Sequence, residues 1–139
     1  MTRFVLDASV ALRWFLDHPV SAYADRVKQQ MLAGARAVVP SLWHLEVANG
    51  LAVAERRGVL TAADVDECVV DIENLLAQAI ETDRGLIPLG PALQTARRFG
   101  LSAYDAAYLN VARQERLPLA TLDERLRRAA AASGVRLLK

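Results

Sequence analysis

Phe4-Val5-Leu6-Asp7-Ala8-Ser9 lies near the start of this 139-residue chain and indicates how it begins to fold. The three apolar residues predict a short buried strand, and a helix is expected from about Ser9 to Leu16. Asp7 ends the strand where the core meets solvent, a place in which an unpaired carboxylate is costly. The chain therefore begins with a strand, an acid and a helix.

Three later stretches also place an acid at the end of a short apolar run. They read His44-Leu45-Glu46, Ala103-Tyr104-Asp105 and Ala120-Thr121-Leu122-Asp123. Four such acids in one small α/β chain predict that separate sheet and helix ends converge on one acidic pocket. The carboxylates of such a pocket repel one another unless a cation lies between them. Ligands that are all oxygen atoms favour Mg²⁺ or Mn²⁺ over zinc.

Short strands alternate with helices along the chain, and this order predicts a parallel sheet covered by helices on both faces. Strands are expected at 4–6, 37–39, 118–121 and 135–138, with a short or edge strand at 87–89. Helices are expected over about 9–16, 21–33, 41–57, 61–79, 91–99, 102–114 and 123–132, with Ser21, Ser41, Thr61 and Ser102 as caps. Ligands bind such sheets beyond the carboxyl ends of the strands, so Asp7 and Asp123 belong at that edge.

The composition suits a single compact domain over residues 1–139, with 53% hydrophobic and 24% charged residues. One cysteine, Cys68, excludes an internal disulfide and falls in phase with the apolar positions of a helix. The apolar N-terminal stretch is interrupted by Asp7 and Arg13, and no run is long enough for a membrane span. We therefore expect no signal peptide, no membrane partner and a cytoplasmic protein.

The formal net charge of +1 conceals an uneven distribution. Residues 64–83 carry seven acids and no base, whereas residues 84–139 carry ten bases and four acids. Fifteen of the seventeen bases are arginine, a residue that suits phosphate contacts. A genome biased toward arginine codons explains this content equally well. The candidate RNA contacts are Arg84, Arg97, Arg98, Arg113, Arg125, Arg127 and Arg128.

Four ordered motifs resemble the PIN-domain ribonucleases, and specifically the VapC toxins of VapBC toxin–antitoxin modules. They are Val5-Leu6-Asp7-Ala8-Ser9, Glu46-Val47-Ala48-Asn49, Leu101-Ser102-Ala103-Tyr104-Asp105-Ala106-Ala107-Tyr108 and Leu119-Ala120-Thr121-Leu122-Asp123. Each motif alone is weak, but their order, spacing and total length agree with the family. The resemblance covers essentially the whole chain.

The resemblance implies a three-layer α/β/α sandwich with a short central parallel sheet. It implies that Asp7, Glu46, Asp105 and Asp123 are the catalytic and metal-binding residues of an Mg²⁺- or Mn²⁺-dependent endoribonuclease acting on structured RNA, such as tRNA or rRNA. Ser9, Asn49 and Thr121 are expected to hydrogen-bond these carboxylates. The implied partners are a VapB-type antitoxin and a second copy of the chain, in a homodimer that forms a heterotetramer or larger assembly with the antitoxin.

Taken singly, each of the four acids also has an ordinary local role. These roles are an Asx turn for Asp7, a surface position for Glu46, a capping box with Ser102 for Asp105, and a helix cap for Asp123. A response-regulator receiver domain also binds Mg²⁺ with acids at strand ends, but it needs an acidic pair after the first strand. A catalytically inactive PIN-like module that binds RNA or protein is the main alternative.

Overall fold

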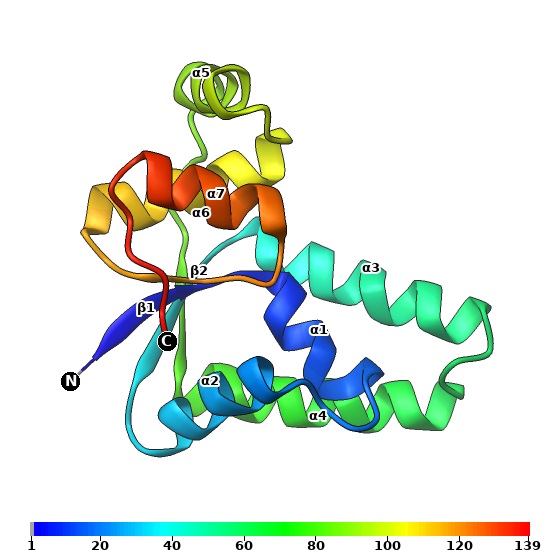
Figure 1. Ribbon diagram of the computed structural model, residues 1–139. Helices are drawn as coiled ribbons and strands as arrows, with labels where there is room; N and C mark the ends of the chain where they lie inside the picture. The colour runs from blue at the N-terminus through cyan, green and yellow to red at the C-terminus, as the bar shows by residue number, and fades with distance from the viewer. Residues whose placement is uncertain (1) are drawn as a thin grey trace.

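The computed structural model describes residues 2–139, which form one four-stranded parallel sheet between two layers of helices (Figure 1). The expected α/β/α sandwich is therefore confirmed. The strands, in the sheet order β3-β2-β1-β4, are β1 (Arg3–Leu6), β2 (Arg36–Pro40), β3 (Ile80–Asp83) and β4 (Leu119–Ala120). The helices are α1 (Ala8–Leu16), α2 (Ala22–Leu32), α3 (Leu42–Arg56), α4 (Ala62–Gln78), α5 (Leu89–Phe99), α6 (Ala103–Glu115) and α7 (Glu124–Ala132).

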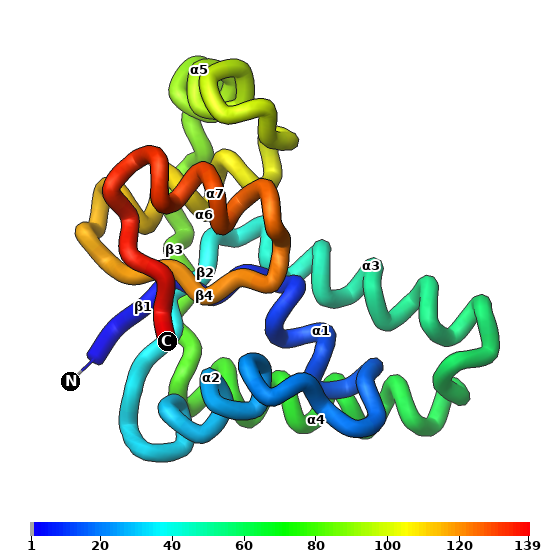
Figure 2. Tube along the Cα trace, in the orientation of Figure 1, coloured from blue at the N-terminus to red at the C-terminus, as the bar shows by residue number. Residues whose placement is uncertain are grey.

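Helices cover the two faces of the sheet in separate groups. Helices α6 and α7 lie over one face with α5 beyond them, and α1, α2 and α4 lie on the other side (Figure 1). Helices α3 and α4 run side by side as a hairpin that extends past the sheet (Figure 2). Strand β1 lies between β2 and β4, and its residues Phe4, Val5 and Leu6 are completely buried. A strand buried on both faces has no polar alternation, which explains its continuous apolar run.

The third strand is not where the sequence places it. The expected strand at 87–89 is wrong, because β3 occupies Ile80–Asp83 and pairs with β2 in register Val38↔Glu81. The chain enters β3 directly after α4, so the helical pattern hides the start of the strand. Pro88 instead occupies the N-cap position of α5, a site where its missing N–H is harmless.

Smaller differences occur elsewhere in the chain. The expected strand at 135–138 is reduced to an isolated bridge between Leu119 and Leu137, because its two hydrogen bonds, from the Leu119 N–H to the Arg136 carbonyl and from the Leu138 N–H to the Leu119 carbonyl, reach only one residue of the short strand β4. Ser41 lies at the N-cap position of α3, but its side chain makes no capping hydrogen bond. The Thr61 capping box and the Ser102 cap are both present. Within residues 2–139, no helix is both long and apolar enough to cross a bilayer.

The C-terminal end of α6 has an unusual backbone. Arg116 terminates this helix with φ 55° and ψ 46°, and it is the one non-glycine residue with positive φ within residues 2–139. Gly100, which ends α5, adopts the same left-handed conformation without a Cβ penalty. For a residue with a Cβ this conformation costs about 1 kcal/mol, so Arg116 stands where glycine is the ordinary choice.

Candidate acidic site

Asp7 lies at the carboxyl end of β1 and is 4% exposed. Its backbone N–H donates to the Ala120 carbonyl oxygen at 2.9 Å, which joins the ends of β1 and β4. Two hydroxyl groups donate to its Oδ2 atom, Ser9 Oγ at 2.7 Å and Thr121 Oγ1 at 2.6 Å. Burial raises the pKa of Asp7, and the two hydroxyl hydrogen bonds offset part of that rise. The predicted supporting roles of Ser9 and Thr121 therefore have a geometric basis.

Asp123 is held at the N-terminus of α7, two residues after Thr121. Its Oδ1 atom accepts the Leu126 backbone N–H at 2.9 Å, so it caps the helix, and its own N–H donates to Thr121 Oγ1 at 3.0 Å. The expected capping role of Asp123 is therefore correct, but it does not compete with a site role. Thr121 is completely buried and connects Asp7 to Asp123 through a single hydroxyl group.

Glu46 reaches the site from α3 and is held by a residue of α6. The Tyr108 hydroxyl donates to Glu46 Oε1 at 2.7 Å. Burial raises the pKa of Glu46, the Tyr108 hydrogen bond lowers it, and the negative charge of Asp7 raises it. Burial and the bond to Glu46 raise the pKa of Tyr108 above its ordinary value, so the phenol stays a donor. A surface position does not account for Glu46, because it is half-buried and fixed by this bond.

Asp105 lies in the first turn of α6, where Ser102 Oγ accepts its backbone N–H at 3.1 Å. Burial raises the pKa of Asp105 to about 6, with further contributions from the negative charges of Asp7, Asp123 and Glu46. A carboxyl group senses other charges in this way only when they are near. Four acids at or near the starts of α1, α3, α6 and α7 thus form one electrostatically coupled group, which we call the acidic site.

The acidic site is more open than a closed metal cage. Within residues 2–139, no three His, Cys, Asp or Glu side chains lie close enough together to hold one ion by themselves. Electrostatic coupling acts over longer distances than metal–oxygen bonds of about 2.0–2.1 Å, so both observations agree. Mg²⁺ commonly takes one or two protein carboxylates and retains several waters, and the oxygen-only donors of this site fit that kind of binding.

The remaining predicted residues fall in different places. Asn49 is exposed on α3, and its side chain makes no hydrogen bond with the described residues, so no contact here supports its predicted supporting role. Arg98, Arg125 and Arg128 line one pocket of about 380 Å³ between α5 and α7. The residues of both pocket walls are near the acidic site in sequence. Gly100 precedes Asp105 by five residues, and Arg125 follows Asp123 by two.

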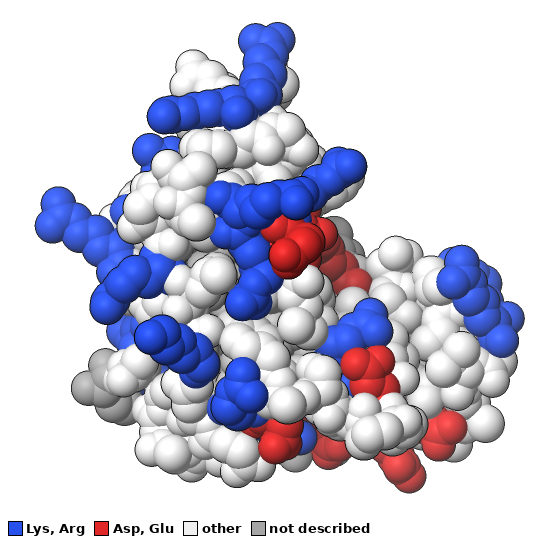
Figure 3. Space-filling view, in the orientation of Figure 1, with Lys and Arg blue, Asp and Glu red and all other residues white. Residues whose placement is uncertain are grey.

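Arg84 and Arg97 are exposed elsewhere, and Arg113 lies at the opposite end of α6. Figure 3 shows basic side chains spread over the part of this face formed by α5, α6 and α7, with acidic atoms gathered where α7 begins.

Two residues of the site have structural roles that the sequence did not assign. Tyr108 follows Asp105 by three residues on the same face of α6, a spacing that offers the one sequence signal for its role. Arg127, placed by sequence among the RNA contacts, instead donates to the Thr121 carbonyl oxygen at 2.6 Å and stacks over the Tyr23 ring at 5.1 Å. Its guanidinium group therefore helps to hold the segment that carries Thr121, a structural contact that the sequence did not indicate.

Comparisons with solved structures agree with this fold. The crystal structure of PAE2754 from Pyrobaculum aerophilum is 26% identical, with a TM-score of 0.65 over 92% of this chain and 86% of that chain. FitAcB from Neisseria gonorrhoeae is 18% identical, with a TM-score of 0.68 over 98% of this chain and 96% of that chain. A domain of a functionally unknown protein from Methanocaldococcus jannaschii DSM 2661 is also 18% identical, with a TM-score of 0.55 over 100% and 92% of the two chains.

The family comparison covers nearly the entire chain. Residues 4–132 match the PIN domain, whereas no curated protein matches the sequence. The matched region contains three whole strands, β1 from its second residue on, and the four acids, from Asp7 at the end of β1 to Asp123 at the start of α7. On this match and on the shared fold, the chain belongs to the PIN-domain family.

Proposed function

We propose that this protein is an Mg²⁺- or Mn²⁺-dependent endoribonuclease whose acidic site consists of Asp7, Glu46, Asp105 and Asp123. PIN domains are generally nucleases that use divalent metal ions. The observation that supports the proposal most is the setting of Asp105: burial raises its pKa most, and the negative charges of Asp7, Asp123 and Glu46 raise it further, as they do only when they are near. Carboxylates that repel one another destabilise the folded protein, and a bound cation relieves this repulsion, so the group suits a cation site.

The residues of this chain would hold such an ion through carboxylates that are already oriented. Hydrogen bonds fix one oxygen each of Glu46 and Asp123, and the other oxygen of each has no hydrogen bond with the described residues. A bound divalent ion lowers the pKa of a water molecule and neutralises charge that develops on a phosphate. Ser9, Thr121 and Tyr108 orient the carboxylates, as residues around metal ligands commonly do.

The pocket of Arg98, Arg125 and Arg128, whose α7 wall begins two residues after Asp123, supports RNA as the substrate class. These side chains have no ion pair with any described residue, so their charges are available to backbone phosphates. Arg98 stacks on Phe99 with 5.2 Å between the guanidinium carbon and the ring centroid. Such contacts position RNA without reading its sequence, which suits an enzyme that selects its site by RNA structure.

More specifically, we propose that the protein is a toxin of the VapC type. This proposal rests on the resemblance of its four sequence motifs to those of the VapC toxins. In this proposal the protein acts in the cytoplasm, cleaves tRNA or rRNA and arrests growth. A VapB-type antitoxin restrains it, and the toxin forms homodimers that assemble into a heterotetramer or larger complex. A basic antitoxin residue that enters the acidic site would compete with metal for the same carboxylates.

Replacing one carboxylate of the site tests the proposal. Asp7→Asn and Asp105→Asn should each abolish Mg²⁺-dependent cleavage of tRNA and rRNA, with little change in folding. The asparagine carbonyl can still accept the hydroxyl hydrogen bonds that Asp7 receives, so the change removes charge and leaves the local contacts. Cleavage is followed on gels with and without chelator, and folding by circular dichroism. Expression of the native chain should arrest growth, and neither variant should.

Asp66→Asn is the matched control, because Asp66 is exposed on α4 and has no hydrogen bond or ion pair with the described residues. It should cleave RNA at the native rate. Native-rate cleavage by Asp7→Asn or Asp105→Asn would contradict the site assignment. A native protein that binds RNA but never cleaves it, with harmless expression, would favour the alternative of a catalytically inactive binding module.

A further inference from the structure

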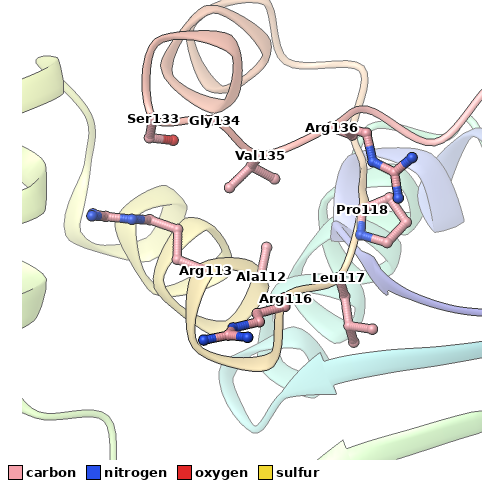
Figure 4. A pocket seen from close by; sticks show the side chains of 9 residues that line it. All are labelled: Ala112, Arg113, Arg116, Leu117, Pro118, Ser133, Gly134, Val135 and Arg136. Carbon is pink, nitrogen blue, oxygen red and sulfur yellow. The ribbon is translucent and has the colours of Figure 1, made fainter.

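A second basic pocket lies at the end of the fold opposite the acidic site. Its volume is about 280 Å³, and it is bordered by the last turn of α6, the start of the β4 segment and the chain that follows α7. Three arginines line it, Arg113, Arg116 and Arg136, together with the apolar side chains of Leu117 and Val135. In Figure 4, Arg113 and Arg116 leave α6 toward the same side, and Arg136 stands across the pocket beside Pro118.

Arg113, Arg116 and Arg136 are exposed, and no acidic side chain of the described residues is paired with any of them. None of the lining residues is acidic, and none of these arginines forms an ion pair with a described residue. Their side chains also make no hydrogen bond within residues 2–139. Three like charges that border one small pocket repel one another, and a bound anion is the ordinary way to relieve that repulsion. Arginine presents paired donors that match phosphate oxygens.

The backbone of Arg116 is an independent indication that this pocket has a role. The residue adopts the left-handed conformation at the end of α6, where glycine is the ordinary choice. An arginine kept in a strained position is explained if its side chain, rather than its backbone, is needed there. The backbone strain and the lack of an ion-pair partner therefore concern the same feature, the Arg116 guanidinium group at the pocket edge.

The pocket and the acidic site lie at opposite ends of the same elements. Helix α6 carries Asp105 in its first turn and Arg113 in its last turn, which separates their backbones by about 12 Å of axial rise. Pro118 begins the segment that leads through β4 to Asp123. A ligand in this pocket cannot be the phosphate that is being cleaved, but it can belong to another part of the same RNA.

We infer that Arg113, Arg116 and Arg136 form a phosphate-binding exosite, which holds the backbone of the RNA substrate away from the cleaved bond. This inference rests on the proposed ribonuclease function for the identity of the ligand. The exosite favours RNAs that are large enough to reach both ends of α6. It contributes affinity through charge, and it reads no base sequence.

Arg116→Gly tests the exosite without damage to the fold, because glycine adopts the left-handed conformation more easily than arginine. The probes are fluorescently labelled bulk tRNA and polyuridylic acid, bound to the full chain over a series of salt concentrations. Arg116→Gly should weaken tRNA binding by about tenfold and reduce the slope of log affinity against log salt by about one. Arg136→Gln should act in the same direction, and the melting temperature of Arg116→Gly should be equal to or above that of the native protein.

Arg57→Gln is the matched control, because it removes one charge from the exposed tip of the α3–α4 hairpin. It should leave affinity and salt slope unchanged. Native affinity and slope in both Arg116→Gly and Arg136→Gln would overturn the exosite, even if the native protein cleaves RNA. The exosite would stand, and the ribonuclease proposal fail, if these variants bind weakly while the native protein never cleaves. ATP that binds at this pocket and is not displaced by RNA would assign it to a free nucleotide and overturn the RNA assignment.

Discussion

At the scale of single residues, the hydroxyl groups around the acids determine how the carboxylates are presented. Thr121 Oγ1 donates to Asp7 and accepts the Asp123 N–H, and Tyr108 donates to Glu46 from a different helix. Each of these groups is buried, so its hydrogen bonds have little competition from water. The site is therefore oriented before any ligand enters it.

Removing the Tyr108 hydroxyl should release Glu46 without disturbing the helix that carries both Tyr108 and Asp105. We expect Tyr108→Phe to lower RNA cleavage by about tenfold, the smaller loss found when a partner of a metal ligand is removed. Stability should fall by about 2 kcal/mol, since one hydrogen bond to a charged group is lost. Cleavage rates at several Mg²⁺ concentrations, together with denaturant unfolding, measure both effects.

Tyr104→Phe provides the control for this change. Tyr104 lies one turn earlier on α6, is 64% exposed and has no hydrogen bond with the described residues. Its loss of a hydroxyl should alter neither cleavage nor stability. If Tyr108→Phe retains the native cleavage rate and metal dependence, the orienting role of Tyr108 is wrong.

At the scale of the elements, capping residues at the helix ends are the local sequence signals that locate where a helix begins. Thr61 and Asp64 form a reciprocal capping box, in which Thr61 Oγ1 accepts the Asp64 N–H at 3.1 Å and Asp64 accepts the Thr61 N–H at 3.0 Å. Both bonds join residues three apart, so they depend on no other part of the fold. Such signals locate a helix start correctly from the residues alone.

The capping box also allows stability to be changed far from the acidic site. Thr61→Ala should lower the free energy of unfolding by about 1 kcal/mol, because α4 loses the acceptor for one of its first N–H groups. RNA cleavage per folded molecule should stay native. Urea unfolding and a cleavage assay at low temperature separate the two effects. Glu73→Ala, an exposed change within α4, should shift stability much less, and equal losses in both variants would contradict the capping role.

At the scale of the whole molecule, the convergence of the acids makes stability depend on pH and on metal. Burial and three neighbouring carboxylates raise the pKa of Asp105 from 3.8 to about 6, and the pKa values of Asp7 and Glu46 shift in the same direction. The unfolded chain ionises these groups near pH 4, so the folded state holds more protons between about pH 4 and 6. Asp105 therefore makes stability fall as the pH rises through this window, and the raised pKa values of Asp7 and Glu46 act in the same direction.

Asp105→Asn should remove its share of this pH dependence. Without divalent metal, the variant should gain about 1 kcal/mol over the native protein between about pH 4 and 7, a figure reduced for solvent screening at a half-exposed group. Adding Mg²⁺ at pH 7 should stabilise the native protein more than the variant. Denaturant unfolding over a pH series measures both, with Asp66→Asn as the flat reference. A stability difference that does not change with pH would contradict the coupling of the four acids.

The parts of this protein that its sequence determines alone are those that depend on neighbouring residues. Apolar runs that end in Asp7 and Asp123 predict buried strands with acids at their carboxyl ends, and caps at Thr61 and Ser102 predict helix starts. The apolar neighbours of Glu46 and Asp105 also mark these acids as unlike ordinary surface acids, and the family motifs add their expected role as metal ligands. The sequence did not predict strand β3, because this edge strand is short and its first residue continues the apolar pattern of α4.

Only the tertiary structure decides which distant side chains meet. Thr121 and Asp7 are separated by 114 residues, and Tyr108 and Glu46 by 62, so no local pattern relates them. The same holds for the arginines: Arg127 bonds to the Thr121 carbonyl, Arg98 and Arg125 share a pocket between α5 and α7, and Arg116 and Arg136 share another at the end of α6. Local sequence determines hydrogen bonds between neighbours and the period of apolar residues, whereas packing of the layers determines where each charge lies and which charges share a pocket.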